Sequence, residues 1–180
     1  KKWNPRIMRR MKCGFTSENR KDEGLCLGLS VGDNLVLANL KEISPGNKIS
    51  HNLEKQYIER QIDDLQIKVA DYKMPVRSLS GGNQQKVVVG NWLNTKPEIL
   101  FMDEPSRGVD VSAKQQIFQV MWDAAKEGVA ILMVSSELEE LLEVCDRILI
   151  MRNGHIRDEK LAGELTVESI YSLCMQVETE

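Results

Sequence analysis

Two short stretches of this sequence carry residue types that bind phosphate and metal ions. The first is Ser80-Gly81-Gly82, which stands directly before a stretch with helical spacing. A helix N-terminus presents unpaired N–H groups and a partial positive charge, and glycines let a phosphate approach the backbone closely. The Ser80 hydroxyl can either cap the helix or donate to a phosphate oxygen. Taken alone, this stretch favours an ordinary capped helix over an anion site.

The second stretch is an apolar run, Ile99–Met102, that ends in Asp103-Glu104. A short, wholly apolar run is typical of a buried parallel strand, and open α/β sheets bind ligands at the carboxyl ends of their strands. Asp103 is placed to hold Mg²⁺, directly or through water, and Glu104 to polarise a water that attacks a terminal phosphate. Taken alone, this run favours a strand that simply ends in solvent.

The elements expected around these stretches alternate between helix and strand from Ser80 onward. Helical spacing is found over 81–94, 112–128 and 137–145, and short apolar runs over 98–103 and 129–136 predict two buried strands. Strands that alternate with helices imply a parallel sheet with right-handed crossovers. Asn153-Gly154 predicts a β-hairpin, and Thr166 predicts the cap of a last helix that runs to Gln176.

The part before Ser80 lacks this alternation. Roughly the first 25 residues are basic and irregular in pattern. Ser30 with Asp33 makes a capping-box-like helix start, and apolar positions between Asn52 and Ile67 have helical spacing. Met74-Pro75 then breaks the pattern. We therefore expect a separate helical lobe before Ser80.

Bulk composition excludes several classes. At 180 residues, one domain is expected, and two small lobes are possible. A net charge of −3 argues against a nucleic-acid binder driven by phosphate neutralisation. The four cysteines form no C-x-x-C pair and only two histidines are present, so reduced thiols are expected rather than a zinc site or a disulfide frame.

No apolar run reaches the ~18 residues of a membrane span, and the basic start has no signal-peptide core. Because the chain starts with Lys, we expect it to be a piece of something longer.

The order and spacing of these stretches resemble the second half of an ABC-type ATPase. Leu79–Gln85 resembles the signature motif, Ile99–Glu104 the Walker B strand with its catalytic glutamate, and Ser106–Asp110 the D-loop. In detail, "SENRKDEGLCLGLSV", "LSGGNQQKV", "DEPSRGVDV" and "VSSELEELLEVCDRILIMRNG" are similar to the C-terminal ATPase half of the fused importer subunits for ribose, galactose, xylose and related sugars. The resemblance covers roughly residues 6–165.

The resemblance implies an α/β fold, a truncated ABC-ATPase nucleotide-binding domain with a parallel-sheet core, a helical lobe and a C-terminal β-hairpin. It divides the chain into a core segment with a Q-loop-like region (1–29), a helical subdomain (30–78), a part with the signature, Walker B, D-loop and remaining core (79–165), and a C-terminal helix (166–180). A P-loop reads G-x-x-x-x-G-K-[ST], and this chain has no Gly-Lys dipeptide. In the family that loop lies upstream of residue 1. We therefore expect negligible ATPase activity from the isolated chain.

The resemblance also implies ATP and Mg²⁺ as cofactors. In the family, two ATPase halves pair head to tail, so each nucleotide lies between one half's P-loop and the other half's signature. Glu104 and Ser136 would be catalytic, and Asp103 and Glu18 would hold the metal. Asp110 would belong to the D-loop. The residues that would serve the partner's nucleotide in trans are Ser80, Gly81, Gly82, Asn83 and Gln84.

Two positions depart from most ABC ATPases. Glu18 stands where a glutamine usually contacts Mg²⁺, and Ser136 stands where a histidine usually reaches the γ-phosphate. Serine is shorter and cannot carry positive charge. Both changes occur in the C-terminal halves of the sugar-importer class. We therefore expect the signature given in trans to be the main contribution of this half, and its own hydrolysis site to be weak.

The implied partners are a second ATPase half, a transmembrane sugar permease and, indirectly, a periplasmic sugar-binding protein, with no nucleic acid. The implied location is the cytoplasmic face of the inner membrane, as a peripheral protein. The helical lobe would pass the motion of the ATPase halves to the permease.

Three alternatives remain open from the sequence. Gly28–Gly32 matches the G-x-S-x-G nucleophile elbow of α/β-hydrolases, with Ser30 as nucleophile, Asp110 or Asp146 as orienter and His155 as base. A non-transport ABC ATPase, such as a ribosome-binding translation factor, is the second. The third is an inactive remnant of the importer subunit.

Overall fold

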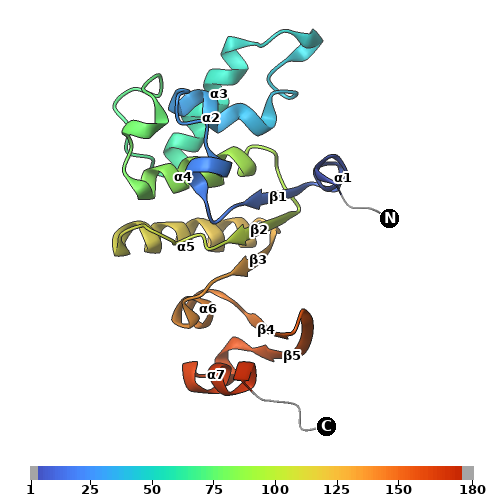
Figure 1. Ribbon diagram of the computed structural model, residues 1–180. Coiled ribbons are helices and arrows are strands. Elements are labelled where there is room, and N and C mark those ends of the chain that lie inside the picture. Colours follow the sequence, from blue (N-terminus) through green and yellow to red (C-terminus); the bar gives the residue numbers. More distant parts are fainter. Residues whose placement is uncertain (1–3, 176–180) are drawn as a thin grey trace. The chain divides into compact units, whose positions relative to one another are not determined.

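The computed structural model describes residues 4–175, and the chain divides into two compact units, residues 1–134 and 135–180. The first unit contains a three-stranded parallel sheet, in the order β1 (Cys13–Thr16), β2 (Ile99–Asp103), β3 (Ala130–Val134) (Figure 1). The parallel sheet expected from the alternation of helices and strands is therefore confirmed.

Helices α4 (Gly81–Leu93) and α5 (Val111–Lys126) lie in the connections between the strands. Both connections step across the sheet in the same direction, so right-handed crossovers put both helices on one face. Leu100 and Met102 are buried on that face. A Cβ added to Gly14 would lie 2.9 Å from Leu100 Cδ1 and 3.3 Å from Trp92 Cβ. The α4 helix therefore packs on β1, beside β2, the strand that ends at Asp103.

The helices expected before Ser80 are present as α2 (Val31–Val36) and α3 (His51–Asp64) (Figure 1). They do not form a separate lobe, because they share a buried apolar cluster with α4 and belong to the same unit as the sheet. The name helical lobe is kept for residues 30–78. Ser30 and Asp33 form the predicted capping box at the start of α2. A Cβ added to Gly90 of α4 would lie 2.8 Å from Leu65 Cδ1 and 3.0 Å from Leu35 Cδ2, so α4 approaches both helices closely. Buried side chains shared by the lobe and α4 are Val31, Leu35, Val36, Ile43, Ile58, Leu65, Ile67, Val76, Val87 and Val88.

The second unit contains α6 (Leu138–Val144), the antiparallel pair β4 (Arg147–Arg152) and β5 (His155–Leu161), and α7 (Val167–Met175). The predicted hairpin is confirmed, because Asn153 and Gly154 have φ values of 48° and 76°, as a two-residue turn requires. Thr166 Oγ1 accepts the N–H of Ser169 at 3.2 Å, as a cap does. The expected end of the last helix at Gln176 lies outside the described residues.

The prediction of an irregular N-terminal region was wrong. This region contains α1 (Pro5–Arg10), β1 and a π-helical turn, Arg20–Gly24. Asn4 caps α1 by accepting the N–H of Ile7 at 3.0 Å, and Pro5 occupies the first turn, where its missing N–H costs nothing. β1 forms through its pairing with β2, which lies more than 80 residues later in the chain. A four-residue strand of this kind has little local signal.

The predicted burial of the strand over 129–136 was also wrong. β3 is an edge strand of the sheet, and its side chains alternate between half-buried and exposed. Leu132 is 44% exposed and Val134 is 52% exposed, and Phe15, in the same pleat position of β1, is 51% exposed. The reason is that α4 and α5 cover one face of the sheet only, so an apolar run is not buried on both sides.

Among residues 4–175, no helical segment combines the length and the hydropathy that a membrane span needs.

Candidate functional site

Three segments from distant parts of the chain meet at the start of α4. They are the Glu18 segment (residues 17–20), the stretch that resembles the signature (Leu79–Gln85, hereafter the signature) and the stretch that resembles the D-loop (Ser106–Asp110, hereafter the D-loop). Arg20 connects them: its Nη1 donates to the carbonyl oxygen of Arg107 at 2.6 Å, and its Nη2 donates to that of Gly108 at 3.2 Å. In the opposite direction, the guanidinium of Arg107 forms an ion pair with Glu18. The Glu18 segment and the D-loop are thus linked twice, by the hydrogen bonds of Arg20 and by the ion pair of Arg107.

Ser80 is the N-cap of α4. Its Oγ accepts the backbone N–H of Asn83 at 3.5 Å and the Nδ2–H of the same residue at 3.0 Å. Asn83 Oδ1 in turn accepts the N–H of Lys68 at 2.9 Å, which fixes the signature to the loop after α3. A hydroxyl carries one donor besides its acceptor lone pairs, and the N–H groups of a helix's first turn have no intrahelical partner. The start of α4 therefore offers donors to an anion.

The two signature glycines lie against other parts of the site. A Cβ added to Gly81 would lie 2.8 Å from Arg20 Nη2 and 3.0 Å from the carbonyl oxygen of Gly108. A Cβ added to Gly82 would lie only 2.3 Å from Ala113 Cβ, in the first turn of α5. Larger residues would push α4 away from the D-loop and from α5. The glycines therefore serve close backbone packing here.

Gln84 is the fifth expected signature residue, and it is enclosed. It is 5% exposed, and its Nε2 donates to the carbonyl oxygens of Leu79 at 3.1 Å and Val76 at 3.5 Å. Its Oε1 is buried without a partner in the described part of the chain. The side chain of Gln84 thus anchors the loop that leads into the signature.

The two acidic residues lie where the central strand ends. Asp103 is the last residue of β2 and is half-buried. Glu104 follows it with a φ of 47°, in the left-handed region that non-glycine residues seldom adopt. Its N–H donates to the carbonyl oxygen of Val134 at 2.9 Å, so the end of β3 holds this conformation. Such local strain is often found at functional sites.

The D-loop is a tight turn between these acids and α5. The N–H of Arg107 donates to the carbonyl oxygen of Glu104 at 3.1 Å, and Gly108 has a φ of 67°. Asp110 caps α5, since its Oδ1 accepts the N–H of Ala113 at 3.0 Å. The turn thus runs from Glu104 to Asp110, and Asp110 holds Ala113, the residue against which Gly82 packs.

The donor set fits Mg²⁺ bound together with a nucleotide. Among the described residues, no three His, Cys, Asp or Glu side chains are grouped as a protein-only metal site would need. Mg²⁺ is usually held by one or two carboxylates together with phosphate oxygens and waters. Asp103 can supply such an oxygen directly, whereas the carboxylate of Glu18 must first leave Arg107. Burial lowers the pKa of the Arg20 guanidinium, which remains charged at neutral pH.

Ser136 belongs to the second unit, so its surroundings are given by the residues of that unit. Its neighbour Ser135 donates from Oγ to Glu140 Oε2 at 3.1 Å and accepts the N–H of Glu137 at 3.0 Å. These bonds shape the entry into α6. The other expected residues, Glu18, the signature, Asp103, Glu104 and Asp110, all lie in the first unit.

The hydrolase alternative is not supported at Ser30. A nucleophile elbow needs a strand directly before the serine, and no strand precedes Ser30 in the stretch 25–29. The Oγ of Ser30 donates to Asp33 Oδ2 at 2.6 Å and accepts the N–H of Asp33 at 3.0 Å. The proton of this hydroxyl and one of its lone pairs are therefore used in a helix cap.

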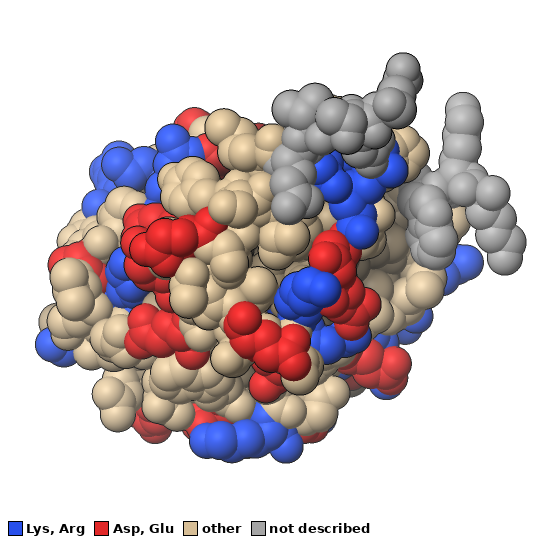
Figure 2. All heavy atoms as spheres, turned by 90° about the horizontal axis from the view of Figure 1, so that it is seen from below, with Lys and Arg blue, Asp and Glu red and all other residues tan. Residues whose placement is uncertain are grey.

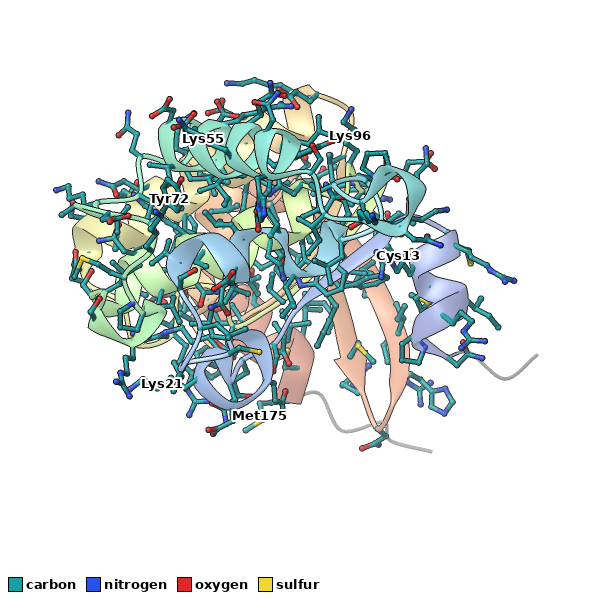
Figure 3. The ribbon with its side chains drawn as sticks, turned by 90° about the horizontal axis from the view of Figure 1, so that it is seen from above. Cys13, Lys21, Lys55, Tyr72, Lys96 and Met175 are labelled. Atoms are coloured by element: carbon teal, nitrogen blue, oxygen red, sulfur yellow. The ribbon has the colours of Figure 1, made fainter. Side chains whose placement is uncertain are left out.

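Two cavities lie elsewhere in the first unit. One, of about 680 Å³, is lined by the C-terminal half of α3, the end of α4 and α5; the other, of about 520 Å³, by the starts of α2 and α3. Figure 3 labels Lys96 of the first cavity and Lys55 with Tyr72 of the second, toward opposite ends of α3. The second cavity includes Ser30, the nucleophile of the hydrolase alternative, but neither cavity is lined by a residue expected to bind nucleotide or metal. On the face shown in Figure 2, acidic and basic side chains are interspersed.

Arg20 is the site residue that the sequence did not point to. It stands two residues after Glu18, in a stretch that already carried a candidate metal ligand. Its partners lie 87 and 88 residues further along the chain. Only the fold shows that they meet, because no spacing rule connects such distant positions.

The model of the family described as "ABC transporter" matches residues 8–107. The ribose import ATP-binding protein RbsA of Bacillus subtilis is 46% identical over 170 residues, which are 94% of this chain and 34% of that protein. The protein of the same name from Oceanobacillus iheyensis is 47% identical over 162 residues, 89% of this chain and 33% of the relative. This chain therefore spans about a third of the length of these relatives.

Solved structures show the same fold at lower identity. The cbiO1 protein of Clostridium perfringens, part of the ABC transporter complex cbiONQ, superposes with a TM-score of 0.72 at 18% identity, over 91% of this chain and 63% of that one. A nucleotide-free ATP-binding cassette from an ABC transporter gives a TM-score of 0.71 at 20% identity, over 97% of this chain and 69% of that one.

Proposed function

Because this chain belongs to the ABC transporter family, we propose that it is part of an ATP-hydrolysing subunit that powers the import of a monosaccharide across a membrane. The observation that carries the proposal is 46% identity over 94% of the chain to a ribose import ATP-binding protein. The meeting of the signature, the D-loop and the Glu18 segment at the start of α4 supports it.

In this proposal the signature acts on a nucleotide held by a second ATPase half. The Ser80 hydroxyl donates to its γ-phosphate, and the N–H groups of Gly81 and Gly82, at the positive end of α4, stabilise the negative charge. Asn83 holds the Ser80 side chain, and Gln84 holds the loop before it. Backbone donors fixed in this way need little rearrangement when charge develops on the phosphate.

On the same half, Glu104 orients a water and Asp103 takes Mg²⁺, with Glu18 as a second oxygen ligand once its ion pair opens. Bound MgATP supplies the phosphoanhydride bond that is cleaved. Ser136, in place of a residue that carries positive charge, makes this half's own site weak. Asp110 holds the D-loop to α5. The main contribution of this half is then the signature given in trans.

The proposed partners are a second ATPase half, a transmembrane permease contacted by the helical lobe and, indirectly, a periplasmic sugar-binding protein. The location is the cytoplasmic face of the inner membrane, without insertion. Alone, the 180-residue chain should have negligible ATPase activity, because it contains no P-loop sequence to hold the β- and γ-phosphates.

The test compares Gly81→Asp with Glu104→Gln in the full-length subunit, assembled with its permease. An aspartate at position 81 puts negative charge where the phosphate binds, and its Cβ would also crowd Arg20 and Gly108, so turnover should fall by about 100-fold or more. Glu104→Gln should reduce turnover by only about twofold, because this half's own site contributes little. Uptake of labelled ribose and release of phosphate are measured together.

Gly28→Asp is the matched control, because Gly28 has open space around its Cα and lies outside the site. It should leave turnover unchanged. If Glu104→Gln abolishes turnover and Gly81→Asp does not, the proposed division of roles is wrong. A folded full-length subunit that never binds MgATP would instead indicate the inactive remnant.

A further inference from the structure

Arg20 contacts two parts of the site to which the proposed function assigns different nucleotides, the D-loop and the start of α4. Its two terminal nitrogens donate to successive carbonyl oxygens of the D-loop, at Arg107 and Gly108. The planar guanidinium presents its donors as a fork, which suits two neighbouring acceptors. A lysine keeps the charge but has a single compact ammonium group, so it cannot reproduce both bonds with the same geometry.

The start of α4 packs against this same contact. A Cβ on Gly81 would lie 2.8 Å from Arg20 Nη2 and 3.0 Å from the oxygen that Nη2 binds in Gly108. The first residue of the signature helix thus lies against both members of one hydrogen bond. If Arg20 moved, the D-loop would lose its donors and α4 would lose a packing partner.

A second link runs beside the first. The side chain of Arg107 forms an ion pair with Glu18, two residues before Arg20. The Glu18 segment and the D-loop therefore hold each other in both directions. When the Glu18 carboxylate turns to a metal ion, its ion pair with Arg107 opens, and the two hydrogen bonds of Arg20 remain as the link to the D-loop. Among the described residues the buried Nε of Arg20 has no partner, so the two terminal nitrogens of Arg20 carry its link to the D-loop.

We propose that Arg20 is a positioning residue that makes the Glu18 segment, the D-loop and the start of α4 move together, and thereby couples the two nucleotide sites of the paired ATPase. The coupling rests on the proposed function, in which Glu18 serves this half's nucleotide and the signature serves the partner's. The mechanical link among the three segments rests on the contacts alone.

The first test is hydrogen exchange on the full-length subunit, comparing wild type with Arg20→Lys. Amides in 79–85 and 105–110 should exchange about tenfold faster in the variant, as expected for loss of a hydrogen bond to a charged group. Arg60→Lys is the matched control, since Arg60 pairs with Asp64 on the surface of α3, and it should change neither region. Circular dichroism verifies folding, and Arg20→Gln replaces Arg20→Lys if that variant is unfolded.

The second test measures ATP hydrolysis with the same proteins. Arg20→Lys should lower kcat about tenfold with KM for ATP within about twofold, and move the Hill coefficient for ATP from above 1 toward 1. Loss of folded protein would lower the apparent kcat but would not change the Hill coefficient.

Faster exchange confined to residues 18–24, or exchange equal to wild type, would overturn the link. An unchanged Hill coefficient, or a wild-type value of 1, would overturn the coupling. A wild-type subunit that does not hydrolyse ATP would contradict the proposed function, while the exchange comparison would still decide whether Arg20 joins the three segments.

Discussion

Gly82 shows how a single side chain, or its absence, sets the geometry of the site. The first turns of α4 and α5 approach so closely that a Cβ at position 82 would overlap Ala113 Cβ. Ala113 is itself held by Asp110 through the cap of α5. Glycine at this position therefore brings the signature and the D-loop into one cluster.

Replacing Gly82 by alanine should lower the free energy of unfolding by about 1–3 kcal/mol, because two packed helices must separate. Urea titration followed by circular dichroism measures this change. Gly28→Ala is the matched control: nothing lies within 4 Å of its added Cβ, and the lost freedom of the unfolded chain should leave stability equal or slightly higher. Equal losses of unfolding free energy in both variants would mean that the contact with Ala113 is not the reason why position 82 requires glycine.

The α4 helix combines a functional start with a structural body. Beyond the signature, Lys86 is 2% exposed, and its Nζ donates to the carbonyl oxygen of Gln66 at 3.0 Å. Gln66 has a φ of 49° and leads out of α3, so Lys86 supports the turn that ends the lobe's longest helix. Burial, together with nearby Lys68, lowers the pKa of Lys86 below its ordinary value of 10.5.

The lowered pKa of Lys86 makes the free energy of unfolding depend on pH in one direction. Between the folded-state pKa and 10.5, the unfolded chain binds more protons at Lys86 than the folded chain does, so stability rises with pH. The stability of wild type relative to Lys86→Met should therefore increase as the pH rises toward 10.5. Urea titrations across that range measure the difference. Gln85→Met, at the neighbouring buried position, has no group to titrate, and its difference from wild type should stay flat. A flat difference for Lys86→Met would contradict the argument.

Taken whole, the chain consists of two units with separate apolar clusters. Leu35 is buried in the cluster of the helical lobe and α4, and Ile170 is buried in a cluster of the hairpin, α6 and α7. Each unit therefore has its own source of stability. The expected site residues other than Ser136 lie in the first unit, so its stability governs their geometry.

Truncating a core residue should destabilise one unit only. Ile170→Ala should cost about 2–5 kcal/mol in the second unit and speed exchange of amides in β4 and β5, with α2 and α4 unchanged. Leu35→Ala should give the reverse pattern. Hydrogen exchange with peptide resolution measures both. If either change speeds exchange across the whole chain, the units unfold as one.

Features whose signals lie within a few residues were predictable from the sequence. The capping box at Ser30, the caps at Ser80 and Thr166, the turn at Asn153-Gly154 and the periodic helices all follow from hydrogen bonds or packing between near neighbours. The parallel sheet followed from the alternation of these elements. The family followed from the order of Leu79–Gln85, Asp103-Glu104 and Ser106–Asp110.

Features that depend on distant partners became visible in the folded chain alone. β1 exists because β2 supplies its hydrogen bonds, and β3 is half exposed because helices cover one face of the sheet. Arg20 acquires its place from carbonyl oxygens 87 and 88 residues away. Such contacts depend on how the chain folds back on itself, and neither propensity nor periodicity carries that information, since both describe only neighbours along the chain.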